Sequence, residues 1–442
     1  MSLLQAERAR RNGGYNSHNS STQQAQPILK PEALYGLAGK IVATVSPHSE
    51  ADPVAILTNV LTAFGNVVNP IPYFRVEHSQ HYLNLFTVQV GETSKGRKGL
   101  AWSTPRRMIR GIDSTWQTAG GLSSGEGLVY AVRDERREKK PIREKGRVVD
   151  YEYVLVDEGA SDKRLLLIEE EFSQALKVMA REGPIIRQAW DSLTLSPLTK
   201  NNPLKATGSH ISIIGHITRA ELLRHLNDIE QSNGFGNRFC WFLVSRSKCI
   251  ATPNGVPEDE LIGLTEEVRQ AVYFSRKVAE MRRDENAEKE WQSVYPALSE
   301  GKPGLVGAMI SRGEAQVMRI ACIYALMDQS QTIGIKHLEA ALSLWEFSES
   351  SIKSIFGDSQ GDPTVDRIIA GLKQGPMTET EIRDLFSRHN SADVDRALGF
   401  IFNNGIGKPE IEATGGRPRT VWNRIANRAA TKETKATKGR EG

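Results

Sequence analysis

The sequence predicts an α/β protein that carries a smaller, separate unit at its C-terminal end. Residues 72–255 alternate short β-rich runs with stretches of helical periodicity, which is typical of an α/β sheet. Residues 256–357 then become almost wholly helical. A linker rich in Gly and Asp at 358–363 precedes a compact segment, 364–426, with its own pattern of helices and glycine-bracketed strands.

The composition is that of an ordinary globular protein, with 39% hydrophobic and 25% charged residues in 442. Lys+Arg 57 against Asp+Glu 53 gives a net charge of +4, too small to indicate nucleic acid by itself. Cys240, Cys249 and Cys322 form no C-x-x-C pair, which excludes a zinc knuckle and a disulfide framework. With no signal peptide and no apolar run near the length of about 18 residues that a membrane span needs, we expect a cytoplasmic protein without a membrane partner.

Composition and the periodicity of apolar residues indicate the structure of the segments that flank the sheet region. Residues 1–28 are polar and predict a disordered arm, as does the Lys/Thr/Ala-rich tail 427–442. Apolar residues at helical spacing in 29–71 predict a helical lead-in to the sheet. Within the helical region, residues 314–327 and 336–347 are the clearest amphipathic helices.

Five runs are interpreted as strands of the α/β region: 83–90, 147–156, 164–169, 210–216 and 238–245. A dense charge run at 133–147 stands between them. It is interpreted as the solvated tip of a hairpin, with a DNA-tracking loop as the functional alternative.

The first of these strands leads into the loop Gly91-Glu-Thr-Ser-Lys-Gly-Arg-Lys-Gly99 and then a helix. Glycines let backbone N–H groups turn toward an anion, and a helix N-terminus adds a favourable dipole. The loop departs from the standard G-x-x-x-x-G-K-[ST] spacing, because lysine arrives one position late and glycine replaces the hydroxyl. An ordinary basic loop is the alternative. The candidate residues for binding ATP are Gly91, Thr93, Ser94, Gly96, Arg97, Lys98 and Gly99, with Arg97 or Lys98 as the phosphate-binding cation.

A strand of consecutive aliphatic residues, 164–168, ends in three glutamates. Such a strand suits the interior of a parallel sheet, and carboxylates at its end lie where ligands bind in open α/β sheets. Glu169 is the candidate ligand of Mg²⁺, and Glu169 or Glu171 the catalytic acid that orients water. The alternative is that these glutamates simply begin the next helix, where negative charge is favoured.

Three further residues are candidates for the same site. His216, or Thr218 beside it, follows a strand and is placed to sense a terminal phosphate, although a lone histidine there is also compatible with a structural role. Arg238 lies in a glycine-flanked turn and is a candidate arginine finger, or an arginine that packs the turn. Glu126 stands at capping-box spacing from Ser123, and we expect it to fix a helix start, with a catalytic role in activating water as the alternative.

The C-terminal segment shows three short helices, 364–372, 380–386 and 392–403, followed by a glycine-bracketed hairpin. This is the winged helix-turn-helix pattern, which predicts DNA binding. The third helix begins with acidic residues, so the cations of the hairpin are the candidate DNA contacts; a protein-binding or scaffolding unit is the alternative. These cations are Lys408, Arg417 and Arg419.

The order of these motifs resembles a domain-of-unknown-function family of P-loop ATPase-like proteins from phages and mobile elements, in which the domain often stands beside a primase-polymerase domain. The resemblance rests on residues 90–99, 121–127, 162–172, 187–191, 210–218 and 233–239. It covers roughly residues 31–350 and implies a RecA-like core. It also implies that Lys98 or Arg97 binds phosphate, that Glu169 or Glu171 is the Walker B acid, and that His216 and Arg238 act as sensor and finger.

These observations favour a DNA-associated ATPase, helicase-like or initiator-like, that hydrolyses ATP with Mg²⁺ in the replication of a mobile element. A homo-oligomeric ring such as a hexamer, single-stranded or duplex DNA, and a primase-polymerase are its expected partners. The alternative is a non-catalytic DNA-binding regulator or replication adaptor with a degenerate phosphate loop, favoured by the glycine at position 99.

Overall fold

The structure is a computed structural model that describes residues 27–92, 97–145, 147–196, 204–226, 234–302, 304–357, 362–386, 391–413 and 418–425. The expected C-terminal tail, almost all of the N-terminal arm and most of the linker lie outside this part of the chain. Two hydrophobic cores are present, one built from residues between Ala33 and Phe356 and the other from residues between Val365 and Trp422.

The larger core surrounds a five-stranded parallel sheet in the order β4-β7-β8-β3-β9. Every residue of the two central strands β3 and β8 is buried, which explains their apolar composition. The prediction of an α/β protein is therefore confirmed. The strands are β3 (Phe86–Val90), β4 (Thr118–Ala119), β7 (Arg164–Glu169), β8 (His210–Ile217) and β9 (Phe239–Leu243).

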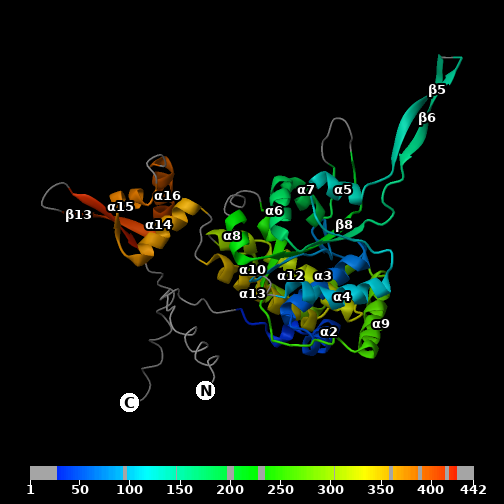
Figure 1. Ribbon diagram of the computed structural model, residues 1–442, viewed down its shortest axis with the longest axis horizontal. Helices are drawn as coiled ribbons and strands as arrows, with labels where there is room; N and C mark the ends of the chain where they lie inside the picture. The colour runs from blue at the N-terminus through cyan, green and yellow to red at the C-terminus, as the bar shows by residue number, and fades with distance from the viewer. Residues whose placement is uncertain are drawn as a thin grey trace, which may run out of the picture.

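Helices cover both faces of this sheet (Figure 1). On one face α3 (Pro53–Val68) packs against β3, β7 and β8, and α4 (Lys98–Ile112) packs against α3. On the other face α6 (Phe172–Arg181) and α7 (Gly183–Trp190) pack against β8, and α8 (Arg219–Leu226) packs against α6.

The segment expected to be a lead-in contains the central helix of this face. Fifteen of the residues of α3 are buried. Its Asn66 donates hydrogen bonds to the Leu165 and His210 carbonyls and to the Ser212 hydroxyl, and so ties two strands together. The helix therefore belongs to the core of the sheet.

The helical region shares the same core. Its strand β10 (Glu280–Arg283) pairs in parallel with β1 (Tyr73–Val76), which precedes the large sheet in the sequence. Together with β2 (Ser79–Tyr82) and β11 (Thr332–Ile333) they form a second sheet in the order β11-β10-β1-β2. The helices of this region are α9 (Glu258–Ser275), α10 (Glu285–Ser299), α11 (Gly304–Ile310), α12 (Gly313–Met327) and α13 (Ile335–Phe356); α2 (Gly36–Val45), from the lead-in segment, packs against α12 and α9.

The charge run folds into a two-stranded antiparallel ribbon, β5 (Arg136–Glu144) and β6 (Arg147–Asp157). It projects from the body of the protein (Figure 1). The hairpin interpretation of this run is confirmed, whereas the strand expected at 147–156 lies in this ribbon and outside the large sheet.

The second core belongs to a unit of three helices and a three-stranded sheet of order β12-β14-β13. The predicted helices and hairpin are present within a few residues of their expected bounds. They are α14 (Pro363–Gln374), β12 (Met377–Thr378), α15 (Glu379–Asp384), α16 (Ser391–Asn403), β13 (Gly407–Glu412) and β14 (Arg419–Arg424).

The structure bears on the expectations about disulfides and about membrane-spanning helices. Each of the three cysteines is a free thiol. Across the described stretches, every helix is too short or too polar to span a lipid bilayer.

Candidate functional site

The loop after β3 brings Lys98 to the carboxyl ends of two central strands. The Lys98 ammonium donates hydrogen bonds to the Gly91 carbonyl at 3.2 Å, to the Ile217 carbonyl at 3.1 Å and to the Glu92 carbonyl at 3.4 Å. The Gly91 N–H in turn donates to the Ile217 carbonyl. Lys98 therefore stands where β3 and β8 both end, at the first residue of α4.

This position is also the point where the chain changes sides of the sheet. The helix that follows β3 lies on the α3 face, whereas α8, which follows β8, packs against α6 on the opposite face. In open α/β sheets ligands bind in the crevice outside the carboxyl ends of the strands at such a switch point. The fold thus predicts a ligand at the place where the sequence predicts a phosphate loop.

The local geometry explains two residues of the loop. A Cβ atom at Gly91 would lie 2.6 Å from the Val244 carbonyl oxygen, so only glycine fits beside the end of β9. Arg97 has a left-handed backbone and its guanidinium pairs with Glu50 at 2.8 Å. Lys98, and not Arg97, is therefore the cation at the strand ends. Thr93, Ser94 and Gly96 lie outside the described residues.

The surroundings of Lys98 include a residue that the sequence interpretation missed. Burial lowers the pKa of Lys98, while Glu221 and Glu92 favour its charged form. Glu221 belongs to a capping box at the start of α8, accepting from the Thr218 hydroxyl at 2.8 Å. The T-x-x-E spacing of residues 218–221 could have revealed it. Thr218 is thereby engaged in capping.

His216 lies beneath the loop in a buried polar cluster. It is the β8 partner of Gln89, and burial together with the charge of Lys98 lowers the pKa of His216 to about 4, so its imidazole is neutral at pH 7. Gln89 donates to the Asn59 side chain at 2.8 Å. His216 Nε2, Gln89 Oε1 and Asn59 Nδ2 are buried without a hydrogen-bond partner among the described residues. His216 therefore contributes a neutral imidazole to a buried polar cluster near Lys98, and its Nε2 is enclosed by protein atoms.

Glu169 ends β7 and is already bound to backbone groups. Its carboxylate accepts hydrogen bonds from the Leu122 N–H at 2.8 Å and the Gly121 N–H at 3.2 Å, and the residue is 5% exposed. Glu171 is exposed and immediately precedes α6. Both glutamates therefore follow the strand as predicted, but Glu169 uses its two oxygens to hold the loop after β4.

The expected capping role of Glu126 is wrong. The helix α5 (Gly125–Ala131) is capped by Ser124, whose hydroxyl accepts from the Gly127 N–H, and Glu126 is exposed. The cap falls one residue later than the S-x-x-E spacing indicates, because Ser124 has the extended backbone that a cap requires.

The residues that could hold Mg²⁺ are few. Within the described ranges, no group of three or more His, Cys, Asp or Glu side chains is arranged to bind a metal. Mg²⁺ in nucleotide sites uses one or two carboxylates together with substrate phosphates. Glu169 is the predicted carboxylate, and each of its oxygens already accepts a backbone hydrogen bond; Glu221 and Glu92 also lie at this end, where they favour the charged form of Lys98.

Arg238 lies at the other end of the sheet. It directly precedes β9, which runs parallel to β3, and a five-residue strand spans roughly 16 Å. Its guanidinium donates to the Gly234 carbonyl at 2.6 Å and to Asp191 at 3.1 Å, and the residue is buried. The structure does not bring Arg238 to Lys98. That Arg238 reaches a phosphate bound by a neighbouring subunit stays a prediction. The burial of the Arg238 side chain does not favour it.

The predicted DNA contacts of the C-terminal hairpin are paired with carboxylates. Lys408 lies 2.6 Å from Glu410, and Arg419 lies 2.9 Å from Glu412. Arg417 lies outside the described residues. The cations of the described hairpin are thus neutralised by their neighbours.

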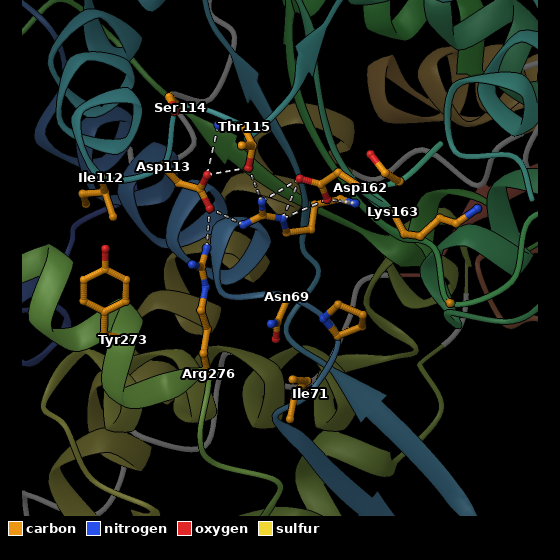
Figure 2. Close-up of a pocket in the computed structure, with 14 residues that line it drawn as sticks. Asn69, Ile71, Ile112, Asp113, Ser114, Thr115, Asp162, Lys163, Tyr273 and Arg276 are labelled. Atoms are coloured by element: carbon orange, nitrogen blue, oxygen red, sulfur yellow. Dashed lines mark hydrogen bonds and ion pairs between the residues drawn. The ribbon is translucent and has the colours of Figure 1, made fainter. Parts of the chain in front are cut away.

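The cavity of 840 Å³ in Figure 2 lies at the amino end of the sheet, around the start of β7. Arg164 bonds to Asp162 and Asp113, and Arg276 bonds to Asp113. The third cation, Lys163, pairs with Asp134. Because each of these cations has a carboxylate partner, we interpret the charges as a structural network that joins α4, β7 and α9.

Asp113 gives this network a pH dependence. Burial opposes its charge, but hydrogen bonds from Thr115, Arg164 and Arg276 outweigh burial and hold the pKa of Asp113 well below its ordinary value. A pKa that is lower in the folded state stabilises the fold above the unfolded value, about 3.9, and this contribution is lost as the pH falls.

We therefore expect Asp113→Asn to lower the free energy of unfolding by about 3 kcal/mol at pH 7. The difference from the wild type should shrink as the pH falls below about 4. Urea unfolding at several pH values measures this difference in the free energy of unfolding. Asp150→Asn is the control, because Asp150 is exposed on the ribbon. A pH-independent difference would show that the charge of Asp113 is not what stabilises the network.

No protein-family model matches this chain, and no curated protein is significantly similar to it. The resemblance to the P-loop family therefore stays an expectation drawn from the motifs.

Proposed function

We propose that this protein is a P-loop ATPase with a RecA-like core that acts on DNA. The observation that carries the proposal is the position of Lys98, whose ammonium stands at the carboxyl ends of β3 and β8 behind a glycine-bracketed loop. The strand order also supports it, because β8 stands between the loop strand and the acidic strand β7.

In this proposal each residue of the site has a separate role in binding ATP. Lys98 neutralises the phosphates of ATP, and the backbone N–H groups of the loop together with the start of α4 bind the same anion. His216, buried near Lys98 and neutral, would be the sensor of the phosphate, as the resemblance implies. Glu169 is the residue that would hold Mg²⁺, which would supply positive charge to offset that of the phosphates.

The DNA part of the proposal rests on the C-terminal unit, whose three helices and hairpin match a winged helix in element order. We expect ATP turnover by the full chain that rises when DNA is added. The test is steady-state turnover without DNA, with single-stranded DNA and with duplex, with light scattering to report the oligomer. Absence of both nucleotide binding and turnover would overturn the proposal.

A second candidate function, a DNA-binding regulator that does not hydrolyse ATP, is favoured by Gly99 and by the engagement of Glu169 with backbone N–H groups. The loop has glycine where a hydroxyl usually binds Mg²⁺. A Cβ atom at Gly99 meets no heavy atom within 4 Å, so a hydroxyl can be added there without a clash.

We expect Gly99→Ser to raise Mg²⁺-dependent turnover by about tenfold or more, since an additional oxygen ligand improves the metal site. Gly263→Ser is the matched control, because Gly263 is also helical with open space at its Cβ, and it should leave turnover unchanged. Absence of turnover in both wild type and Gly99→Ser would favour the regulator.

A further inference from the structure

The ribbon β5–β6 is a feature that the ATPase proposal does not use. It extends from the body without a helix or second sheet on either face (Figure 1). A lone two-stranded hairpin is marginally stable in water. Yet this one exposes large side chains, among them Tyr153 at 69%, Tyr151 at 51% and Leu155 at 45%.

The register sorts the side chains of the ribbon into two unlike faces. Residues directly opposite one another share a face, and the face alternates along each strand. One face carries no carboxylate in the stretch between the two register shifts, and we call it the cationic face. Its residues are Arg137, Lys139, Pro141, Tyr151, Tyr153 and Leu155.

The opposite face is acidic over the same stretch. It carries three carboxylates against one lysine, a net charge of 1 − 3 = −2. Its residues are Glu138, Lys140, Ile142, Asp150, Glu152 and Val154. The ribbon therefore presents one face to a polyanion and keeps the other away from it.

The contacts on the cationic face agree with this assignment. The Lys139 ammonium lies 4.5 Å from the centre of the Tyr151 ring, and Tyr153 is directly opposite Lys139. Arg137, at the base, pairs with Glu135 at 3.1 Å. The outer part of the face thus combines a lysine with two exposed tyrosine rings.

We propose that the cationic face of the ribbon binds single-stranded DNA, with phosphates beside Lys139 and bases stacked on Tyr151 and Tyr153. Stacking on aromatic side chains beside cations is how single strands are bound without sequence preference. The duplex fits less well. A ribbon that reads the major groove does so with polar side chains at base edges, and Pro141 and Leu155 occupy such places here.

This inference rests on the proposed action on DNA and names the surface responsible for it. The C-terminal hairpin is the competing surface, but its described cations Lys408 and Arg419 are paired with glutamates. On the cationic face Arg137 is likewise paired with Glu135, so the charge that this face offers to DNA is that of Lys139, whose ammonium lies beside the Tyr151 ring.

The test is the fluorescence anisotropy of a labelled single-stranded oligonucleotide titrated with the full chain, without ATP. Tyr151→Ala with Tyr153→Ala should weaken binding about tenfold or more, and the two Phe substitutions should preserve it, because stacking needs the ring and not the hydroxyl. Lys139→Ala should reduce the salt slope of the affinity by about 0.7.

The matched control removes the exposed Ile142 and the half-buried Val154 side chains from the acidic face, as Ile142→Ala with Val154→Ala, and should change the affinity less than about twofold. Wild-type affinity in the tyrosine-to-alanine variant, or preference of the wild type for duplex, would overturn the inference. ATP turnover without DNA, measured in the same variants, separates this result from the ATPase proposal, because the ribbon should not alter it.

Discussion

Lys98→Ala is expected to reduce ATP turnover by about 10²–10³-fold, the usual cost of removing a preorganised group that stabilises transferring phosphate. The reason is position: Lys98 is the described cation whose ammonium lies at the ends of both β3 and β8. Steady-state turnover at saturating Mg²⁺ and ATP measures the effect.

Lys289→Ala is the matched control, since Lys289 is an exposed lysine on α10. It should retain wild-type turnover. Circular dichroism shows whether Lys98→Ala still folds, which matters because its ammonium bonds to three carbonyls. A folded Lys98→Ala protein with wild-type turnover would exclude the loop as the catalytic site.

Arg319→Ala is expected to lower the free energy of unfolding of the larger core by about 3–5 kcal/mol. Arg319 is fully buried in α12, and burial lowers its pKa. Its guanidinium donates to the Asn84 carbonyl at 2.7 Å and to the Trp190 carbonyl at 2.9 Å, and it lies 3.7 Å from the centre of the Trp190 ring. Removing it takes the Arg319 donor from the buried Asn84 carbonyl and one of two donors from the Trp190 carbonyl, which keeps the Asn84 amide at 3.1 Å.

Urea unfolding of the full chain measures this loss. Arg282→Ala is the control, because the Arg282 side chain is 81% exposed and its ion pair with Glu280 is at the surface. It should cost less than about 1 kcal/mol. Equal losses in the two variants would mean that the Arg319 contacts do not hold β3, α7 and α12 together.

The sequence predicted the parts of the fold that depend on neighbouring residues. The apolar runs of β3, β7 and β8 were recognisable because both faces of these strands are buried. The two-residue strand β4 and the pairing of β1 with β10 were not, since both depend on contacts between distant segments. α3 has helical periodicity, but its central place follows from Asn66 binding the strands, which no local pattern indicates.

In the candidate site, too, local patterns in the sequence were informative and contacts between distant residues were not foreseen. Lys98 was found from loop spacing, and Arg97 could be separated from it only through its pairing with Glu50, 47 positions earlier in the sequence. Arg238 was grouped with the site from a local turn, but a turn before a strand and a loop after a parallel strand lie at opposite ends of a sheet. The sequence contained that information once the strands were taken as parallel.

The central claim is that the loop before α4 binds ATP through Lys98. Isothermal titration calorimetry of the full chain with Mg²⁺ and ATP tests it most directly. The account predicts saturable binding to wild type and to Lys289→Ala, and much weaker binding to Lys98→Ala. Equal binding by wild type and Lys98→Ala, or no binding by the wild type, would contradict it.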